Sequence, residues 1–381
     1  MPDLSAIERD PTLDALKQQL VRDNPPQQRM YLGGSVVGRE CERQLWFDFR
    51  WVLQNHFDAD TLARFADGHA SEKTISDRLK AIQGVTLWAE NEKGEQYGFE
   101  ELGGHLRGHL DGVIKGLLQA PKTTHVWEHK AVNERKWRSL QAKKEKWGEK
   151  RALEQWDLVY YAQAQIYLGQ AKLMRHYLTV ATPGSRDITS CRTDFHQAAY
   201  DRLMEKAKRI VFSPIPLEPI SKKPEYYICR WCSYKDMCFG EQVAQVNCRT
   251  CAHITPKTNG TWFCEFHKKT LTNKEQRSGC NKHVFNPALI PFGTVTDMDQ
   301  EANTITYKTE GGTQFINANE NDWSQYQFTS RDLKHLTGDL LDRETDFFSL
   351  MARFDGAHIE SVTKEKKKPE VVLEPTPLAS T

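Results

Sequence analysis

The chain has 381 residues, which predicts about two domains if one domain takes roughly 150 residues. Its formal net charge of +1 excludes a strong global field, so any affinity for nucleic acid has to come from local patches. No apolar run approaches the ~20 residues of a membrane span, and the polar, acidic N-terminus is unlike a signal peptide. We therefore expect a cytoplasmic protein without a membrane partner, in which nine cysteines serve metal binding rather than disulfides.

The first part of the chain is predicted to be mainly helical, because apolar residues recur every three or four positions. This spacing predicts helices over Pro11–Arg22, Ser35–Trp51 and Thr61–Ile82. In the second helix Ser35 is the expected N-cap, and Cys41 lies inside the helix. Residues 84–102 are predicted to form a strand, a turn at residues 91–95 and a second strand.

The stretch Gly104–Val132 is predicted to form two strands joined by a loop at residues 119–122. Asp111 lies on the first strand, and Glu128 and Lys130 share one face of the second. Two close carboxylates repel each other unless a cation lies between them, and magnesium prefers such oxygen ligands. A lysine beside that cation can orient the water that attacks a phosphate, so the set predicts a metal-dependent phosphodiesterase. Taken singly, a Glu-x-Lys triplet also arises by chance, and Asp-Gly also forms hairpin turns.

Residues 130–151 are basic, with nine Lys or Arg against three Glu, and two tryptophans are interleaved. Basic side chains neutralise phosphates, and exposed indoles stack on unpaired bases. The alternative is a solvated helix face whose tryptophans pack inward. The candidate DNA contacts are Arg135, Lys136, Trp137, Arg138, Lys143 and Lys144.

The following segment completes an α/β pattern, a mixed sheet flanked by helices. It predicts a helix over Leu153–Leu173, strands over 174–182 and 187–194, and a helix over 197–212. In the first helix Gln163 and Tyr167 are four residues apart and share a face.

The remaining chemistry-bearing residues are cysteines in two sets. Cys229, Cys232 and Cys238 have the spacing C-x2-C-x5-C, and Cys41 is available upstream as a fourth ligand. The second set is predicted to be a zinc module, with His253, His267 and His283 as substitute ligands. Its proposed zinc ligands are Cys248, Cys251, Cys264 and Cys280. Cys191 is left over and is expected to be buried.

The motifs GHLDG at Asp111 and EHK at Glu128–Lys130 resemble the PD-(D/E)XK nuclease superfamily, in particular its RecB-like branch. The resemblance implies a restriction-endonuclease-like fold with magnesium or manganese held by Asp111, Glu128 and the carbonyl of His129. It implies a further metal ligand four residues after Gly68, which is Glu72, with His69 as the runner-up. It also implies that Gln163 and Tyr167 support the catalytic residues, with Gln165 as the second choice.

The first cysteine set resembles that of the iron–sulfur nucleases related to AddB and to the CRISPR-adaptation nucleases. The resemblance implies that Cys41, Cys229, Cys232 and Cys238 hold a 4Fe–4S cluster that ties the two ends of the nuclease domain together. A structural zinc ion bound by the same four thiolates is the alternative, because spacing alone does not separate the two.

Taken together, these resemblances cover about Ser35–Cys238 and imply a DNA exonuclease, acting on single strands or duplex ends. Recombination, repair or phage DNA metabolism would be its setting, with a recombinase, helicase or single-strand-binding protein as partner in a bacterial or phage-infected cell. The alternatives are a non-catalytic DNA-binding platform and a zinc-dependent interaction protein. The predicted parts are a nuclease domain over 1–245, a Cys-rich module over 246–290, a small α+β region over 291–355 and a disordered tail over 356–381.

Within the α+β region the sequence predicts strands over 293–297, 304–308 and 313–318, followed by helices over 331–341 and 344–354.

Overall fold

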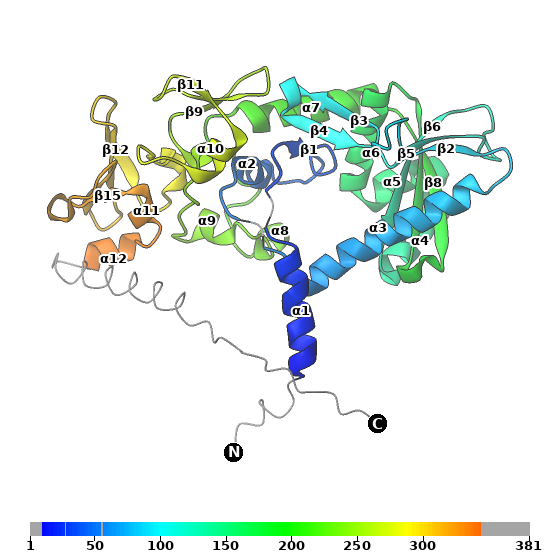
Figure 1. Cartoon of the computed structure of the whole chain (residues 1–381), viewed down its shortest axis with the longest axis horizontal. Helices are drawn as coiled ribbons and strands as arrows, with labels where there is room; N and C mark the ends of the chain where they lie inside the picture. The colour runs from blue at the N-terminus through cyan, green and yellow to red at the C-terminus, as the bar shows by residue number, and fades with distance from the viewer. Residues whose placement is uncertain (1–9, 27, 55, 344–381) are drawn as a thin grey trace, which may run out of the picture.

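A computed structural model describes residues 10–26, 28–54 and 56–343 of the chain. These ranges form an α/β arrangement of four sheets flanked by helices, so the predicted class is confirmed (Figure 1). The predicted helix over 344–354 and the predicted tail over 356–381 lie outside the described residues. No helix in the described ranges is both long and apolar enough to cross a membrane.

A five-stranded mixed sheet carries the residues of greatest chemical interest. Its strand order is β2-β5-β6-β7-β8, in which β6 and β7 are parallel and the other pairs are antiparallel. The strands are β2 (Thr86–Trp88), β5 (Gly112–Lys115), β6 (His125–Ala131), β7 (Arg175–Ala181) and β8 (Ile188–Asp194).

Helices cover both faces of this sheet. The long helix α3 (Ala59–Lys80) begins at the N-cap Asp58 and packs Ile75 and Leu79 against Trp127 of β6. The opposite face is covered by α4 (Glu134–Trp147), α5 (Glu149–Trp156) and α6 (Leu158–Ala171). Because side chains alternate along β6, Glu128 and Lys130 point to the α6 side, whereas Trp127 and His129 point to α3.

The prediction of a single helix over Leu153–Leu173 is wrong, because the helix is interrupted at Asp157. The Asp157 side chain accepts hydrogen bonds from the backbone N–H groups of Val159 and Tyr160, both at 3.0 Å. A side chain that caps the first turn of α6 in this way starts a new helix, so α5 ends one residue earlier.

The predicted strand around Asp111 is also two strands in the structure. β4 (Leu106–His109) belongs to a separate three-stranded sheet with β1 (Leu32–Gly33) and β3 (Gly98–Glu101), whereas β5 belongs to the five-stranded sheet. Asp111 therefore lies at the junction of two sheets rather than within one strand. The predicted turn at 91–95 is present, closed by the N–H of Asn91 and the carbonyl of Glu95 at 2.8 Å.

The predicted helix over Ser35–Trp51 begins later than expected. The helix α2 (Glu42–Arg50) has Cys41 as its N-cap, and residues 34–38 form turns. Pairing with β4 explains the difference, because the N–H of Gly34 donates to the carbonyl of Arg107 at 2.8 Å and is drawn into the sheet. Cys41 thus sits at a helix entrance and not inside a helix.

The chain after β8 adds helices and two further sheets. The helices are α7 (Gln197–Phe212), as predicted, then α8 (Tyr227–Arg230), α9 (Lys235–Phe239), α10 (Asn273–Ser278), α11 (Ser330–Leu333) and α12 (Gly338–Arg343). One sheet joins β9 (Ile254–Pro256), β10 (Trp262–Cys264) and β11 (Lys269–Leu271). The other joins β12 (Thr294–Asp299), β13 (Thr304–Lys308), β14 (Gln314–Ala318) and β15 (Gln327–Thr329).

The predicted helix over 331–341 is divided between α11 and α12. Short 3-10 turns connect the elements at Leu102–Gly104, Pro183–Ser185, Cys248–Thr250, Pro287–Leu289 and Trp323–Gln325.

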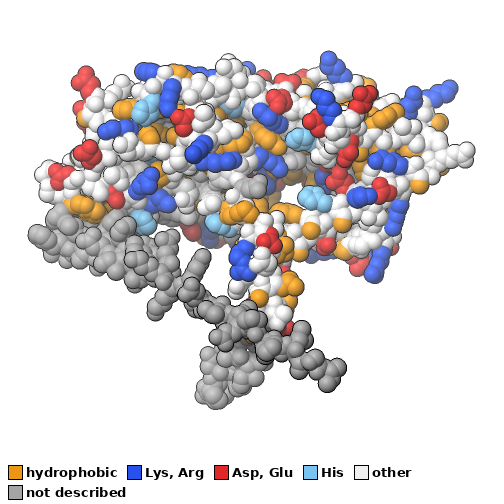
Figure 2. Space-filling model, viewed as in Figure 1, with side chains coloured by type: hydrophobic (Ala, Val, Ile, Leu, Met, Phe, Trp, Pro, Cys, Tyr) orange, Lys and Arg blue, Asp and Glu red, His pale blue; other side chains and the backbone are white. Residues whose placement is uncertain are grey.

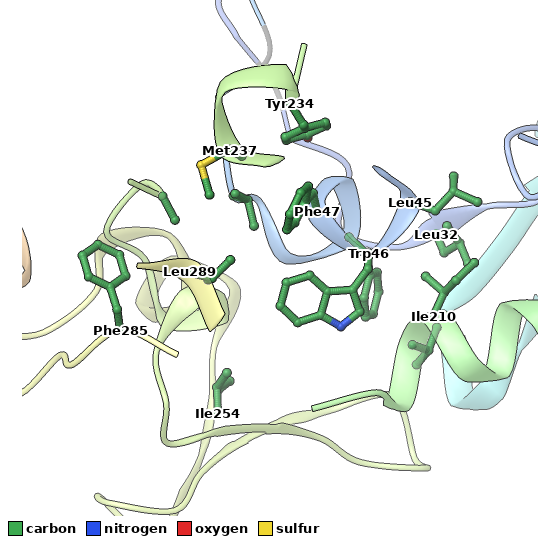
Figure 3. Packing of buried hydrophobic residues seen from close by; sticks show 14 of the residues in the cluster. Leu32, Leu45, Trp46, Phe47, Ile210, Tyr234, Met237, Ile254, Phe285 and Leu289 are labelled. Carbon is green, nitrogen blue, oxygen red and sulfur yellow. The ribbon is translucent and has the colours of Figure 1, made fainter. Parts of the chain in front are cut away.

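One hydrophobic cluster crosses the predicted boundary at 245/246. Trp46 and Phe47 of α2 lie between Ile210 of α7 and the later residues Leu289 and Phe285 (Figure 3). The same cluster continues to β12–β15 through residues such as Tyr307, Phe315 and Phe328. The domain boundaries stay a prediction, but the parts that they separate share a core.

The helix α1 (Pro11–Asp23), as predicted from its leucine spacing, projects away from this core and buries no residue (Figure 1). Its Lys17 pairs with Asp60 of α3 at 3.2 Å. On the face seen in Figure 2, basic and acidic side chains are interspersed, as the near-zero net charge predicts.

Candidate active site

The residues predicted from the EHK and GHLDG motifs line one cavity of about 770 Å3. β6 supplies Glu128 and Lys130, the β4–β5 junction supplies Asp111, and α3 supplies Glu72. The predicted pair Gln163 and Tyr167 enters the same cavity from α6, and the runner-up His69 enters from α3. Gln165 lies elsewhere, where its side chain donates to the carbonyl of Asp194 at 3.0 Å.

Glu128 is the most buried acidic group of the cavity, 3% exposed. Its Oε1 accepts a hydrogen bond from Gln163 Nε2 at 2.6 Å and forms an ion pair with Lys130. No donor among the described residues reaches its Oε2, which is buried. The neighbouring group is the carboxyl of Asp111, whose Oδ2 accepts from the backbone N–H of His129 at 2.8 Å.

The charges of this cluster shift one another's pKa values. Burial, and then the charge of Asp111, raises the pKa of Glu72 to about 7. The same two causes raise the pKa of Glu128, and burial raises that of Asp111. Burial opposes the charged form of Lys130, but the attraction of Glu128 and Asp111 outweighs it and raises the lysine pKa. The carboxyl groups therefore resist simultaneous ionisation unless a further positive charge joins them.

Tyr167 closes the α6 side of the cavity. It is 3% exposed, and its ring packs edge-on against Phe99 with centroids 5.6 Å apart. Gly108 permits this approach, since a Cβ at that position would overlap both rings. Burial, followed by the charge of Glu128, raises the pKa of Tyr167 and keeps its hydroxyl protonated.

A buried hydrogen-bond network fixes α3 against β6 directly beside Glu72. Ser71 Oγ lies 2.9 Å from His129 Nε2 and 2.8 Å from Ser185 Oγ. His129 Nδ1 lies 3.0 Å from Thr179 Oγ1 on β7. Burial, followed by the charge of Lys130, lowers the pKa of His129 to about 4, so the ring is neutral. The side chain of His129 thus orients the two elements that carry the carboxylates.

The predicted DNA contacts lie on α4, close to Lys130. Lys136 donates to Asp157 Oδ2 at 2.7 Å and lies over the ring of Tyr160 at 4.4 Å, while Lys130 lies over the same ring at 5.4 Å. Trp137 packs into the hydrophobic cluster between α4 and the sheet, so its indole is not placed to stack on a base. The remaining predicted contacts on this helix are Arg135, Arg138, Lys143 and Lys144. Of these, Arg138 forms an ion pair with Glu134.

The first cysteine set is brought together from the two ends of the predicted nuclease domain. Cys41 at the start of α2 and the three cysteines of α8, α9 and their connection line one small cavity of about 20 Å3. Burial raises the pKa of Cys229, Cys232 and Cys238. Their free thiols are protonated until a metal displaces the protons.

The second cysteine set lines a larger cavity of about 100 Å3, together with His253, His267 and His283. Cys280 Sγ lies 3.6 Å from His267 Nε2, and the backbone N–H of His267 donates to Cys264 Sγ at 3.4 Å. Burial, and then the neighbouring Cys251, raises the pKa of Cys248 to about 12. Cys191 is buried elsewhere, between the sheet and α4–α6.

Within residues 10–26, 28–54 and 56–343, no group of three or more His, Cys, Asp or Glu side chains is arranged to hold a metal ion as it stands. The carboxylates and the two cysteine sets are therefore gathered around cavities without forming completed coordination shells. The carboxylate cavity nevertheless suits a hard cation, because its donors are oxygens and one buried oxygen of Glu128 lacks a donor.

Several lining residues were not predicted from the sequence. Arg29 and Tyr31 precede β1 and enter the cavity through the short pairing of β1 with β4. Lys73, Ser76 and Lys80 continue the face of α3 that carries Glu72. Their spacing of three to four residues is a helical signal that could have been found from the sequence.

No family model and no curated protein matches this chain. Among solved structures it is similar to SSO0001, with 14% identity, a TM-score of 0.34, and coverage of 61% of this chain and 98% of that one. An alkaline exonuclease from Laribacter hongkongensis has 11% identity and a TM-score of 0.31, covering 51% and 90%. A phage-related exonuclease from Haemophilus somnus has 12% identity and a TM-score of 0.27, covering 39% and 68%. Similarities this low establish neither an activity nor a ligand for this chain.

Proposed function

We propose that this protein is a metal-dependent deoxyribonuclease that hydrolyses phosphodiester bonds. The observation that carries the proposal is the buried Oε2 of Glu128, which no donor from the described part of the chain reaches although it lies beside Asp111. A buried carboxylate without a partner is costly unless a cation or a proton completes the site. Lys130 alone does not complete it, because the ammonium group is bound to the other oxygen, Oε1.

Magnesium or manganese fits this donor set, with Glu72, Asp111, Glu128 and the carbonyl of His129 as the proposed ligands. When bound, such an ion polarises the phosphate and increases the acidity of a water molecule. The chain itself supplies the positioning. Gln163 fixes one oxygen of Glu128, and the N–H of His129 fixes one oxygen of Asp111.

Lys130 has the role of the positive group at the reaction centre. Its raised pKa keeps it charged over the physiological pH range, and it is only partly exposed, at 21% of its side chain. In this position the ammonium group orients the attacking water and offsets the charge that develops on the phosphate. Tyr167 and Gln163, both buried, limit access of other water to Glu128.

We propose that exonucleolytic processing of single strands or duplex ends is the activity, in recombination, repair or phage DNA metabolism. Arg135 and Arg138 are exposed on α4, the helix whose Lys136 lies over the same Tyr160 ring as Lys130, and they would hold the DNA backbone. A recombinase, helicase or single-strand-binding protein is the proposed partner.

The cysteine sets are proposed as two structural metal sites. A 4Fe–4S cluster at Cys41, Cys229, Cys232 and Cys238 would tie α2 to α8 and α9. Zinc at the second set would hold together the 3-10 turn Cys248–Thr250, strand β10 and the segment that follows helix α10. A single structural zinc ion held by the same four thiolates is the alternative for the first set. Iron, sulfide and zinc analysis of anaerobically purified protein decides between them.

Purified protein, end-labelled single-stranded and duplex DNA, and magnesium or manganese test the enzymatic proposal directly. We expect cleavage that stops when the cation is chelated and that resumes when it is restored. Cleavage that continues in chelator would contradict the proposed site. Metal-independent binding without any cleavage would instead favour the alternative of a non-catalytic DNA-binding platform.

A further inference from the structure

A second cavity adjoins the carboxylate cavity and extends it along α3. This second cavity, which we call the aromatic cavity, has a volume of about 520 Å3 and is lined in part by Phe57 and Phe65. The segment Arg29–Gly33 lines both cavities, through Arg29, Tyr31 and Gly33. The two hollows are therefore joined along one segment of the chain.

One face of α3 follows the two cavities. Phe65 lines the aromatic cavity, while His69, Glu72 and Ser76 line the carboxylate cavity. Successive members are three or four residues apart and so lie on one face of the helix. Seven residues separate Phe65 from Glu72, a distance of roughly 10 Å along the helix axis. A chain of a few nucleotides spans that distance.

The far end of this groove presents aromatic rings to solvent. Phe57 and Phe65 are 44% and 47% exposed, and their rings meet edge-to-face with centroids 5.1 Å apart. Large exposed aromatic groups that line a cavity are typical of a binding surface rather than of a core. Unpaired bases stack on such rings whatever their sequence, because every base has a π face.

Two arginines lie at the passage between the two cavities: Arg29, which lines both, and Arg107, which also pairs with Glu100 at 2.8 Å. The guanidinium groups of Arg29 and Arg107 each lie 5.6 Å from the centroid of the Tyr31 ring. Gly33 leaves the space that the Arg29 side chain occupies, since a Cβ at Gly33 would overlap its guanidinium group. Arginines at this point suit a phosphate between the reacting phosphodiester and the aromatic rings.

Asp48, the acidic residue that lines the aromatic cavity, does not prevent a phosphate from binding near these arginines. Asp48 is paired with Arg39 at 3.1 Å, and it also accepts a hydrogen bond from the hydroxyl of Tyr234 at 2.7 Å. Its charge is therefore already matched by Arg39.

From these observations we propose that the two cavities form one groove for a single strand of DNA. The reacting phosphate lies at the carboxylates, the next phosphates lie near Arg29 and Arg107, and unpaired bases stack on Phe57 and Phe65. The proposal rests on the proposed nuclease function and adds to it the place where the single strand and its unpaired bases bind. A blunt duplex does not offer its bases to these rings, so the groove favours single strands and frayed ends.

Binding in EDTA, where metal-dependent cleavage is absent, tests this assignment. A labelled single strand of about 12 nucleotides and the matching blunt duplex are titrated by fluorescence anisotropy with the full-length protein. The double substitution Phe57→Leu and Phe65→Leu retains apolar volume but removes the π faces. We expect it to weaken single-strand binding about tenfold and duplex binding less than that, for a loss of stacking worth ~1.4 kcal/mol.

Met298→Ala is the matched control, because Met298 is 63% exposed on β12 and lies outside both cavities. It should bind both DNAs as the wild-type protein does. A second readout needs no substitution: 2-aminopurine placed at successive positions of the strand should report stacking on the wild-type protein a few nucleotides from the bound end.

The outcomes separate this inference from the proposed function. If the leucine variant binds the single strand as tightly as wild type, or loses affinity for both DNAs equally, the groove assignment is overturned while metal-dependent cleavage by the wild-type protein still stands. If the wild-type protein neither binds nor cuts DNA, the proposed function fails as well. Selective loss of single-strand affinity together with a stacking signal at a fixed position supports the groove.

Discussion

Glu128 and Arg249 are both charged residues withdrawn from solvent, at 3% and 1% exposed, yet their surroundings are opposite. Glu128 lies between the sheet and α6 with one oxygen that no donor within residues 10–26, 28–54 and 56–343 reaches. Arg249 lies in the turn between Cys248 and Cys251, where its guanidinium group is enclosed by aromatic rings. The comparison shows how a buried charge with a chemical task differs from one with a structural task.

All three nitrogens of the Arg249 guanidinium group donate hydrogen bonds. Its guanidinium donates to the carbonyls of Phe49 and Met30, both at 2.9 Å, and twice to Oε1 of Gln276, at 3.0 and 2.9 Å. It also stacks over Trp51, with the ring centroid at 3.7 Å. Burial lowers its pKa well below the usual value, but each polar contact is satisfied by the fold itself. Such a group stabilises the fold and awaits no ligand.

The charge of Glu128 is satisfied only in part, and the fold holds it in that state. Buried ionisable groups whose partners are incomplete lower the stability of the fold, and they cluster at binding and catalytic sites. The contrast separates a functional region around β6 from a structural region around the second cysteine set, and experiments on each region test it.

The largest effect is expected from truncation after Val246. Removing the later residues deletes Arg249 and Trp262, which pack against α2, and the carbonyl of Lys257, which bonds His105 at 2.9 Å. The exposed remainder of the shared core should leave the fragment unfolded. Circular dichroism and limited proteolysis check this. A cooperatively folded fragment would show that the predicted boundary at 245/246 separates independent domains.

The next largest effect concerns catalysis. Lys130→Ala should reduce DNA cleavage at least about 100-fold while the protein remains folded, because it removes the positive charge beside the reacting phosphate. Lys308→Ala, an exposed lysine on β13, is the matched control and should cleave at the wild-type rate. Equal rates for wild type and Lys130→Ala would refute the assignment of the site.

Arg249→Met tests the structural side of the comparison. The carbonyls of Met30 and Phe49 would lose their donors, at about 1–3 kcal/mol each, so we expect the free energy of unfolding to fall by about 3–5 kcal/mol. Arg277→Met, at an exposed arginine of the same region, should change it by less than ~0.5 kcal/mol. Urea denaturation measures both, and similar values for the two variants would contradict a structural role for Arg249.

A smaller effect is expected from pH through His105, which lies at the seam between β4 and the second cysteine region. Burial lowers its pKa from 6.5 to about 4. The unfolded chain then binds a proton more readily than the folded one, so this stability is present above pH 6.5 and is lost as pH falls towards 4. At pH 5 the loss is about 2 kcal/mol. His105→Gln should reduce this pH dependence in urea denaturation, and an unchanged slope would exclude His105 as its source.

The elements with strong periodicity and the chemical motifs were predictable from the sequence. The helix over Gln197–Phe212 and the strand over Thr304–Lys308 occur with the predicted bounds, because their patterns are undisturbed by caps or close contacts. Asp111, Glu128 and Lys130 line one cavity, as their strand pattern suggested, and so does Glu72, which only the family resemblance implied.

What the sequence did not reveal depends on contacts between distant segments. The short strand β1 pairs with β4 and carries Arg29 and Tyr31 to the cavity, although two residues of strand leave no periodic pattern. Asp157 resembles any polar residue of a helix until its capping bonds are seen. Arg249 resembles a surface arginine of a zinc module, since nothing in CRTC indicates that its side chain points into the core.

Manganese titration is the most direct test of the claim that the unsatisfied carboxylate of Glu128 marks a metal site. Isothermal titration calorimetry is performed on wild-type protein and on Glu128→Gln, which preserves size and hydrogen bonding but removes the charge. We predict that the wild-type protein binds Mn2+ and that the variant binds it at least about tenfold more weakly, with its thermal unfolding still cooperative. Equal affinities for the two proteins, or no binding to the wild type, would contradict the account.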